Sequence, residues 1–233
     1  KVMAPPHGAC NERALEEMAQ LGFEAACISS GSLRHYNSEA MWLHTFGMKP
    51  SNIIAGLPVF HRFRISGTCH SNILMAALLD QPIVLVGHHH DVAGGLHLLA
   101  DLSAFVNSLG IVHWADMKCI SRSHYARRIE GKILRVKMFT KRIEVCVPEG
   151  IKQIFVERPW LQGEESMPLA WKRLNDGSEW NLSHSDEPIP VLPYQEVEIA
   201  AESPKPFMDT MNGRNFHLWP VVRRQLTEVR DRL

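Results

Sequence analysis

The sequence predicts an α/β fold, with a mainly parallel sheet or part of a β/α barrel, followed by a small antiparallel β-sandwich and a C-terminal helix. The first observation is that apolar runs and amphipathic segments alternate up to about residue 129, as they do when helices join parallel strands. The second is a change after residue 130 to period-two alternation between Pro and Gly turns, which indicates antiparallel strands. We therefore expect an α/β domain at residues 1–129, a sandwich at 130–203, and a loop and helix at 204–233.

The opening residues predict one strand–helix–strand unit. Residues 1–6 have the pattern of a strand that is ending, and Asn11 is suited to cap the helix that follows. Gly22 is placed to end that helix in a left-handed conformation, before a strand at residues 23–28. Residues 29–52 are rich in turn formers, so we expect a long loop there.

Apolar patterns place the remaining elements. The run at residues 82–86 is typical of a strand buried on both faces, and the pattern at 96–109 is that of an amphipathic helix. A helix is also expected to start at Pro220. The further expected elements are strands at 57–64, 111–114, 132–138, 143–147, 154–156 and 196–199, with helices at 71–80 and from Asp116 towards Arg128.

Composition excludes some classes of function. Lys plus Arg equals Asp plus Glu at 25 each, so no net charge attracts nucleic acid. No apolar run reaches the roughly 18 residues that a membrane span needs. Five cysteines without close pairing favour free thiols and a reducing, cytoplasmic location. Because the chain begins with Lys1 in a strand-like pattern, we expect it to be the later part of a longer protein.

A cluster of titratable side chains stands between the strand at residues 82–86 and the helix at 96–109. It reads Gly87-His88-His89-His90-Asp91. The carboxyl ends of parallel strands are where α/β proteins build their sites, so this cluster is the leading candidate. If the strand continues, His88 and His90 point to the same side, and a histidine there can donate a proton near neutral pH.

Less specific interpretations of this cluster remain open. The histidines can be part of a polar loop, capping backbone groups or facing solvent. Asp91 can orient an imidazole, or it can be the N-cap of the helix at 96–109, which we favour slightly. A metal site made by three adjacent histidines alone is disfavoured, since such neighbours rarely converge on one ion. Upstream, His61, Arg62 and Arg64 are either a solvated charge cluster or a group that pairs with a carboxylate- or phosphate-bearing glycan.

Several motifs occur in the order found in one known family. Pro5-Pro6-His7-Gly8 forms a turn, a helix ends at Gly22, and Leu85-Val86-Gly87-His88 ends a later strand. Residues 1–125 resemble in this respect the later half of the polysaccharide deacetylases, which have a distorted β/α barrel. The resemblance implies that the first turn lines a substrate groove and that the later strand supplies a general acid.

The resemblance assigns roles to particular residues and implies a cofactor. His88, with His90 as the alternative, is expected to be catalytic, and Pro6, His7, Gly8 and Asp91 are expected on the substrate side. The family uses a divalent metal, usually zinc, held by one Asp and two His beside an Asp base. Its Asp-Asp and His-x-x-x-His motifs are missing from this sequence. The ligands are therefore expected upstream of Lys1, or the activity has been lost.

The resulting functional hypothesis is a metal-dependent hydrolase that removes acetyl groups from a polysaccharide or other glycan. One alternative is a non-catalytic glycan-binding or scaffolding relative that keeps the groove. A less favoured alternative is a glycoside hydrolase, which needs two carboxylates beside the sugar bond; Asp91 and Asp116 are the candidates.

Overall fold

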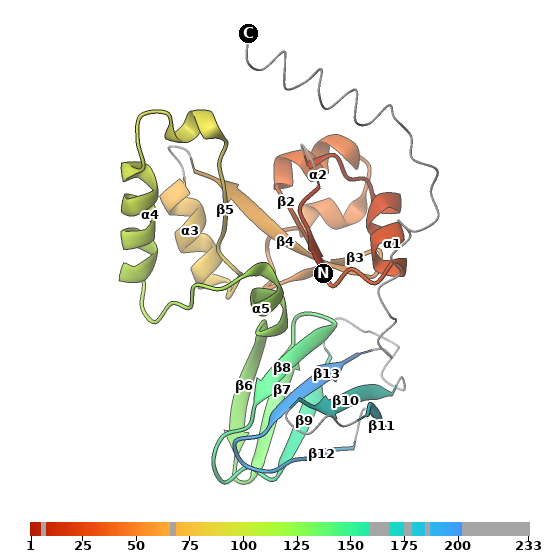
Figure 1. The fold of residues 1–233 in the computed structure, drawn as a ribbon. Coiled ribbons are helices and arrows are strands. Elements are labelled where there is room, and N and C mark those ends of the chain that lie inside the picture. The colour runs from red at the N-terminus through yellow and green to blue at the C-terminus, as the bar shows by residue number, and fades with distance from the viewer. Residues whose placement is uncertain (6–7, 66–68, 159–167, 175–178, 185–186, 202–233) are drawn as a thin grey trace, which may run out of the picture.

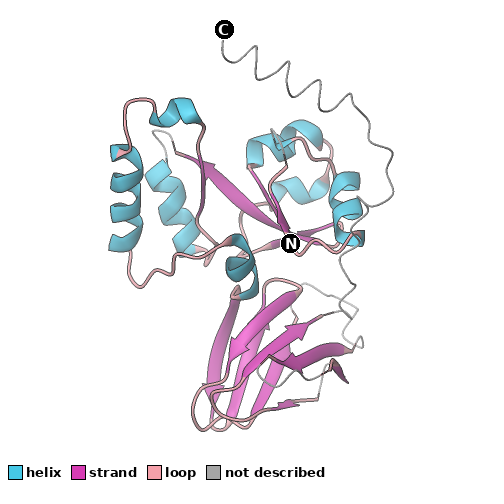
Figure 2. Ribbon diagram, in the orientation of Figure 1, coloured by secondary structure: helices cyan, strands magenta, loops and turns pink. Residues whose placement is uncertain are grey.

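A computed structural model describes residues 1–5, 8–65, 69–158, 168–174, 179–184 and 187–201. It has two parts, an α/β part with helices around a curled sheet and a part made almost wholly of strands (Figures 1 and 2). The short helix α5 (Met117–Arg122) lies at the junction between them. None of the helices in the described part of the chain is both long and apolar enough to cross a membrane.

The α/β part is built on a curled, mainly parallel sheet that forms half of a barrel. Strands β1, β2, β4 and β5 run parallel, while β3 pairs antiparallel with the first half of β4. The carboxyl ends of the parallel strands point away from the sandwich (Figure 1). The strands are β1 (Val2–Met3), β2 (Ala25–Ile28), β3 (Asn52–Ile54), β4 (Leu57–Arg64) and β5 (Val84–Val86).

Helices cover the convex face of this sheet in two groups. One hydrophobic core lies under α1 and α2 around Leu15 and Leu33, and another lies between β5, α3 and α4 around Ile73 and Leu102. The helices are α1 (Glu12–Gln20), α2 (Ser30–Tyr36), α3 (Cys69–Leu78) and α4 (His97–Ser108), with 3-10 turns η2 (Met41–His44) and η3 (His89–Val92).

The concave face of the half-barrel has its own small core. Strand alternation turns Cys27 and Phe60 inward, where they pack with Val84 and with Met117 of α5. Arg62 follows Phe60 two residues later on the same side of β4. The interior is thus apolar beside α5 and becomes charged towards the carboxyl ends of the strands.

The second part is a sandwich of two four-stranded sheets. One has the order β11-β10-β13-β8 and the other β12-β9-β7-β6, and their facing side chains, including Leu134, Ile143 and Ile199, form one core. The strands are β6 (Tyr125–Glu130), β7 (Ile133–Met138), β8 (Arg142–Cys146), β9 (Gln153–Glu157), β10 (Leu169–Arg173), β11 (Asn181–Ser183), β12 (Ile189–Pro190) and β13 (Glu196–Ala200).

An ion-pair network joins the two parts across α5. The guanidinium of Arg122, only 9% exposed, donates to both carboxylate oxygens of Glu24 at 2.8 Å and lies 3.1 Å from Glu198 on β13. Arg122 also pairs with Glu144, and Glu198 pairs with Arg142. Three elements far apart in sequence are therefore held together by charge.

Several expectations about the elements are confirmed. Asn11 caps α1 by accepting a hydrogen bond from the Ala14 N–H at 3.0 Å, and Gly22 follows that helix with a φ of 81°. All five cysteines are free thiols. Half of a barrel and a sandwich are present, whereas a complete deacetylase-like barrel stays a prediction. The helix expected from Pro220 lies outside the described residues.

Other expectations are wrong. Residues 111–114 form no strand, and the helix from Asp116 ends at Arg122, because residues 125–130 pair along their whole length with β7. Residues 29–52 contain α2 and η2 where a loop was expected, and β5 is only half-buried. The sandwich is not purely antiparallel, since β7 and β9 run parallel.

Candidate functional site

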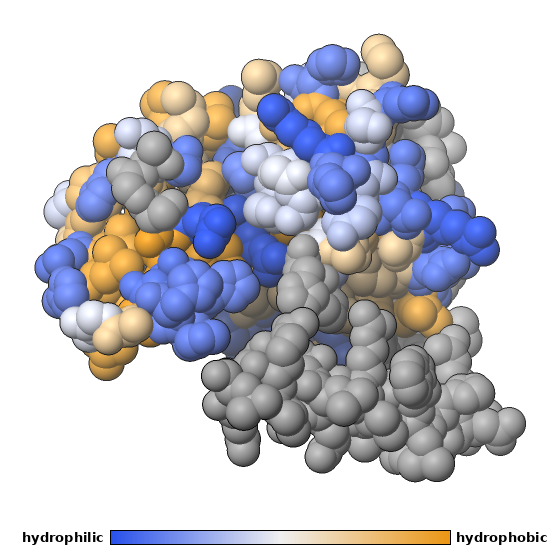
Figure 3. Space-filling view, turned by 90° about the horizontal axis from the view of Figure 1, so that it is seen from above, coloured by the Kyte–Doolittle hydropathy of each residue, from blue (hydrophilic) through white to orange (hydrophobic). Residues whose placement is uncertain are grey.

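A pocket of about 590 Å³ opens at the carboxyl ends of all four parallel strands. We call it the strand-end pocket. Seen from above, this side of the molecule has a strongly hydrophilic area near its middle, with a hydrophobic area towards α3 and α4 (Figure 3). The described residues that line the pocket are Ala4, Pro5, Ser29, Gly31, Ser32, Arg62, Arg64, Val86 and His88.

Two arginines give the strand-end pocket its charge. Arg62 and Arg64 lie two residues apart on β4, so both side chains leave the same face of the sheet. The Nε atom of Arg62 is buried and has no hydrogen-bond partner. Below it lies Cys27, whose pKa burial raises to about 12, although the positive charge of Arg62 acts in the opposite direction. The thiol therefore stays neutral and leaves the charge of Arg62 uncompensated.

The turn that precedes α1 forms one wall of the strand-end pocket. The Gly8 N–H donates to the Pro5 carbonyl at 3.0 Å, and Gly8 has a φ of 68°. A Cβ on Gly8 would lie 2.3 Å from the Ser32 hydroxyl and 3.5 Å from the Arg62 Nη2 atom. Glycine is therefore required here twice, for its backbone angle and for the close approach of the turn to α2.

The histidine cluster forms the opposite rim. The strand ends at Val86, and the Asp91 carboxylate accepts a hydrogen bond from the His88 backbone N–H at 2.7 Å, which fixes the start of η3. This N–H lowers the pKa of Asp91, and the charges of His90 and Arg64 add to the effect. The rings of His88 and His90 stack with their centroids 5.4 Å apart.

The structure brings some of the predicted site residues together. His88 lines the strand-end pocket, whereas Gly8 is not among its described lining residues and lies in the adjoining turn, where an added Cβ would approach Ser32 and Arg62. His90 and Asp91 also lie beside His88, because the chain forms η3 there. The strand does not continue through these residues. The prediction that Asp91 caps the following helix is wrong, since the N-cap of α4 is Leu96. Pro6 and His7 lie outside the described residues.

Sequence reasoning missed the serines at the end of β2. Ser29 caps α2 by accepting a hydrogen bond from the Ser32 N–H, and its hydroxyl donates to that of Ser32 at 2.9 Å. The signal that could have found them was their position, directly after the predicted strand at residues 23–28, where the neighbouring strand ends also carry polar groups. Because a long loop was expected at residues 29–52, these serines were not considered as site residues.

The residues that line this pocket do not fit a divalent metal. Zinc takes thiolate, imidazole or carboxylate ligands, whereas the described lining offers a single imidazole and two guanidinium cations that repel a cation. Within the described ranges, no three His, Cys, Asp or Glu side chains are grouped so as to hold a metal ion. We therefore assign metal binding to none of the described residues.

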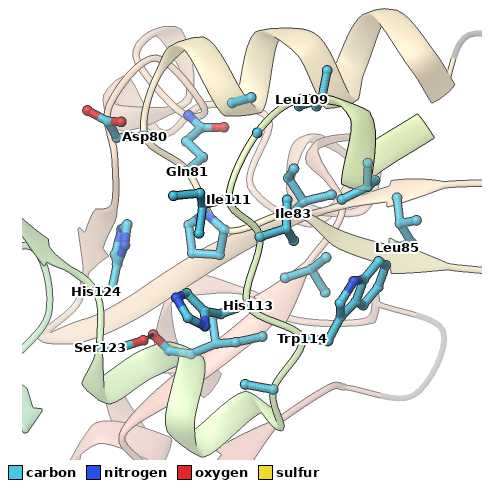
Figure 4. Close-up of a pocket in the computed structure, with 18 of the residues that line it drawn as sticks. Asp80, Gln81, Ile83, Leu85, Leu109, Ile111, His113, Trp114, Ser123 and His124 are labelled. Atoms are coloured by element: carbon cyan, nitrogen blue, oxygen red, sulfur yellow. Dashed lines mark hydrogen bonds between the residues drawn. The ribbon is translucent and has the colours of Figure 1, made fainter. Parts of the chain in front are cut away.

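A second pocket, of about 530 Å³, lies between β5, α4 and α5 (Figure 4). Its lining is mostly apolar, and Ile111 and Trp114 at its edge are 96% and 62% exposed. The imidazole of His124 is bonded through Nε2 to the Pro50 carbonyl at 2.8 Å. Burial lowers the pKa of His124, against that hydrogen bond, so the ring is neutral. This pocket contains none of the predicted site residues.

Comparisons of this protein with protein-family models, with curated proteins and with solved structures found no match. The class of the protein is therefore argued from its fold and from the strand-end pocket alone.

Proposed function

We propose that the protein binds a glycan in the strand-end pocket and acts on it as a hydrolase that removes acetyl groups. One observation carries the proposal: Pro5, in the turn that ends at Gly8, and His88, far apart in the sequence, line a single pocket at the carboxyl ends of the parallel strands. The deacetylase resemblance implies that this turn lines the substrate groove and that this strand end supplies the general acid.

In this proposal His88 is the general acid. Hydrolysis of an N-acetyl group leaves an amine, which must gain a proton as the C–N bond breaks, and an imidazole at the pocket rim can supply it. Asp91 holds the backbone of His88 in place through the 2.7 Å hydrogen bond, and His90 stacks against the ring. Asp91 is therefore a positioning residue, and His90 is the alternative acid.

Acetate release from acetylated oligosaccharides tests this proposal. We expect a His88→Ala variant to lose at least 100-fold in kcat/KM, since a positioned acid contributes about 10²–10⁴-fold. The matched control is His184→Ala, because His184 is exposed on the sandwich. The assay is run with and without a chelator on the longest natural form of the protein. Equal rates for His88→Ala, His184→Ala and the unmodified protein contradict the proposed role.

A second candidate function is glycan binding without hydrolysis. The observation that favours it is the charge of the pocket, in which Arg62 and Arg64 face no lining carboxylate among the described residues. It predicts saturable binding of an oligosaccharide with no acetate release under any metal condition. Binding that is accompanied by chelator-sensitive acetate release favours the hydrolase instead.

The geometry does not support a glycoside hydrolase that uses Asp91 and Asp116. Asp116 accepts the Cys119 N–H at 2.8 Å and caps α5, which lies at the junction with the sandwich. Asp91 lies in η3, which follows the carboxyl end of β5, and that end points away from the sandwich. The two carboxylates therefore do not flank one sugar bond, as that mechanism requires.

A further inference from the structure

We infer that the ligand of the strand-end pocket carries an anionic group, a carboxylate or a phosphate, which Arg62 and Arg64 bind. The inference rests on the proposed function, because it specifies which glycans the same pocket accepts. Nothing in the deacetylase resemblance requires it, since that family's groove motifs contribute neither of these arginines.

The first argument is the placement of the two arginines. β4 is hydrogen-bonded to β2 on one side and to β3 and β5 on the other, so its end is at the centre of the curled sheet. Arg62 and Arg64 leave the same face of β4, and both line the pocket. A ligand that enters this pocket therefore meets two positive charges from the strand in its middle.

The second argument is that no described residue of the chain neutralises the charge of Arg62. No ion pair joins Arg62 or Arg64 to a carboxylate in the ranges that the structure describes, and the Arg62 Nε–H is buried without an acceptor. A buried, unsatisfied donor on a charged group is costly, so such groups in folded proteins are normally paired. A ligand oxygen at this position removes the cost.

The neighbouring groups do not supply the missing negative charge. Cys27 is held neutral by burial, which raises its pKa to about 12. Asp91 responds to the charge of Arg64, but its carboxylate accepts the His88 N–H and stays on η3. Among the described residues, the remaining polar lining consists of the Ser29 and Ser32 hydroxyls and the His88 ring. Arg62 is therefore the strongest unmatched charge in the pocket.

The chemistry of the guanidinium group selects the ligand class. Its planar fork of N–H donors matches the paired oxygens of a carboxylate or phosphate, whereas a neutral sugar offers only single hydroxyl acceptors. The serine hydroxyls and the imidazole can hydrogen-bond the sugar ring beside that anion. A glycan with an acidic substituent can therefore bind the arginines through its anionic group, and the serines and the imidazole through its sugar ring.

Binding of three matched sugars to the full chain tests the inference. The probes are N-acetylglucosamine, its 6-phosphate, and N-acetylmuramic acid, which carries a carboxylate; dissociation constants are measured by NMR titration. We expect at least one acidic sugar to bind at least tenfold more tightly than the neutral sugar, with an affinity that falls as salt is added. The sugar that binds distinguishes a phosphate ligand from a carboxylate, and inorganic phosphate and acetate alone show whether the anion suffices without the sugar.

Charge-removing variants complete the test. Arg62→Gln and Arg64→Gln are each expected to abolish the preference for the acidic sugar, while Arg13→Gln, which removes an exposed arginine on α1, leaves it unchanged. Arg64 is exposed, so Arg64→Gln keeps the test valid if Arg62→Gln fails to fold. Equal affinity for neutral and acidic sugars, or an unchanged preference in a folded Arg62→Gln variant, overturns the inference.

The outcomes separate this inference from the proposed function. Binding or deacetylation of neutral sugars with no preference for the acidic ones contradicts the inference alone. Failure of all three sugars to bind, together with no acetate release, contradicts the proposed function and the inference with it.

Discussion

Gly8 shows how much of the candidate site depends on one residue without a side chain. Its φ of 68° is in the left-handed region, and the place of its missing Cβ is 2.3 Å from the Ser32 hydroxyl. Gly31, which lines the strand-end pocket, has no heavy atom within 4 Å of the place that a Cβ would take. The two glycines therefore give opposite expectations for the same substitution.

A Gly8→Ala variant is expected to lose about 1–3 kcal/mol of unfolding free energy, since the backbone strain and the contact with Ser32 both oppose an added methyl group. Gly31→Ala is the control and is expected to change stability by less than about 0.5 kcal/mol. Urea denaturation followed by tryptophan fluorescence measures both. Equal stability of the two variants would show that the turn does not pack against α2 as described.

At this scale the sequence predicts charge-bearing residues better than it predicts their partners. His88 could be selected because it follows an apolar strand, a position that needs no knowledge of contacts. The unsatisfied Nε of Arg62 could not be predicted from the sequence, because its burial depends on segments that are distant in sequence. The role of Asp91 could not be predicted either. An acidic residue beside a turn can cap the next helix or, as here, accept a hydrogen bond at the start of η3.

At the scale of elements, periodicity predicts those that bury one continuous face. The pattern at residues 96–109 gives α4, and the alternation at residues 132–138 gives β7. Residues 111–114 have a strand-like composition but no paired neighbour, so they stay irregular. Residues 125–130 form a strand because they pair with β7. The local sequence pattern does not predict that pairing.

The N-cap of α1 gives an element-scale prediction. Asn11 accepts the Ala14 N–H at 3.0 Å and satisfies one of the helix's first free donors. Asn11→Ala is expected to lower the unfolding free energy by about 1 kcal/mol, and Asn11→Ser is expected to restore most of it. Thermal melts of the three proteins by circular dichroism compare them. An Asn11→Ser variant as unstable as Asn11→Ala would mean that the side-chain cap is not the cause.

At the scale of the whole molecule, the Arg122 network fixes how the α/β part sits on the sandwich. Burial alone would raise the pKa of Glu24, but hydrogen bonds from Arg122 outweigh it and lower the value to about 2. Burial likewise acts against the charge of Arg122, while its bonds to Glu24 and Glu144 raise its pKa. Local sequence gives no sign of this arrangement, because its members come from the residue before β2, from α5 and from the sandwich.

This network predicts an acid-sensitive stability. The Glu24 carboxylate stabilises the folded state fully above its ordinary pKa of 4.5, and that contribution is lost as the pH falls from 4.5 towards 2. Glu24→Gln is therefore expected to be less stable than the unmodified protein by about 2 kcal/mol at pH 7, with the difference shrinking below pH 4.

Denaturation between pH 2 and pH 7 measures this difference. Glu39→Gln is the control, because Glu39 is exposed on the loop after α2. A Glu24→Gln deficit that stays constant across this pH range would show that the carboxylate is not held by Arg122.

The position of β13 has a consequence for the order in which the protein is made. β13 (Glu196–Ala200) lies between β8 and β10 and carries Glu198, which meets both Arg122 and Arg142. A ribosome delivers β8 and α5 more than fifty residues before it delivers that strand. Until then β8 pairs with no described strand, and Arg122 and Arg142 lack their shared partner Glu198. The nascent chain can therefore complete this sheet, and add Glu198 to the network between its two parts, only after residue 200 has been made.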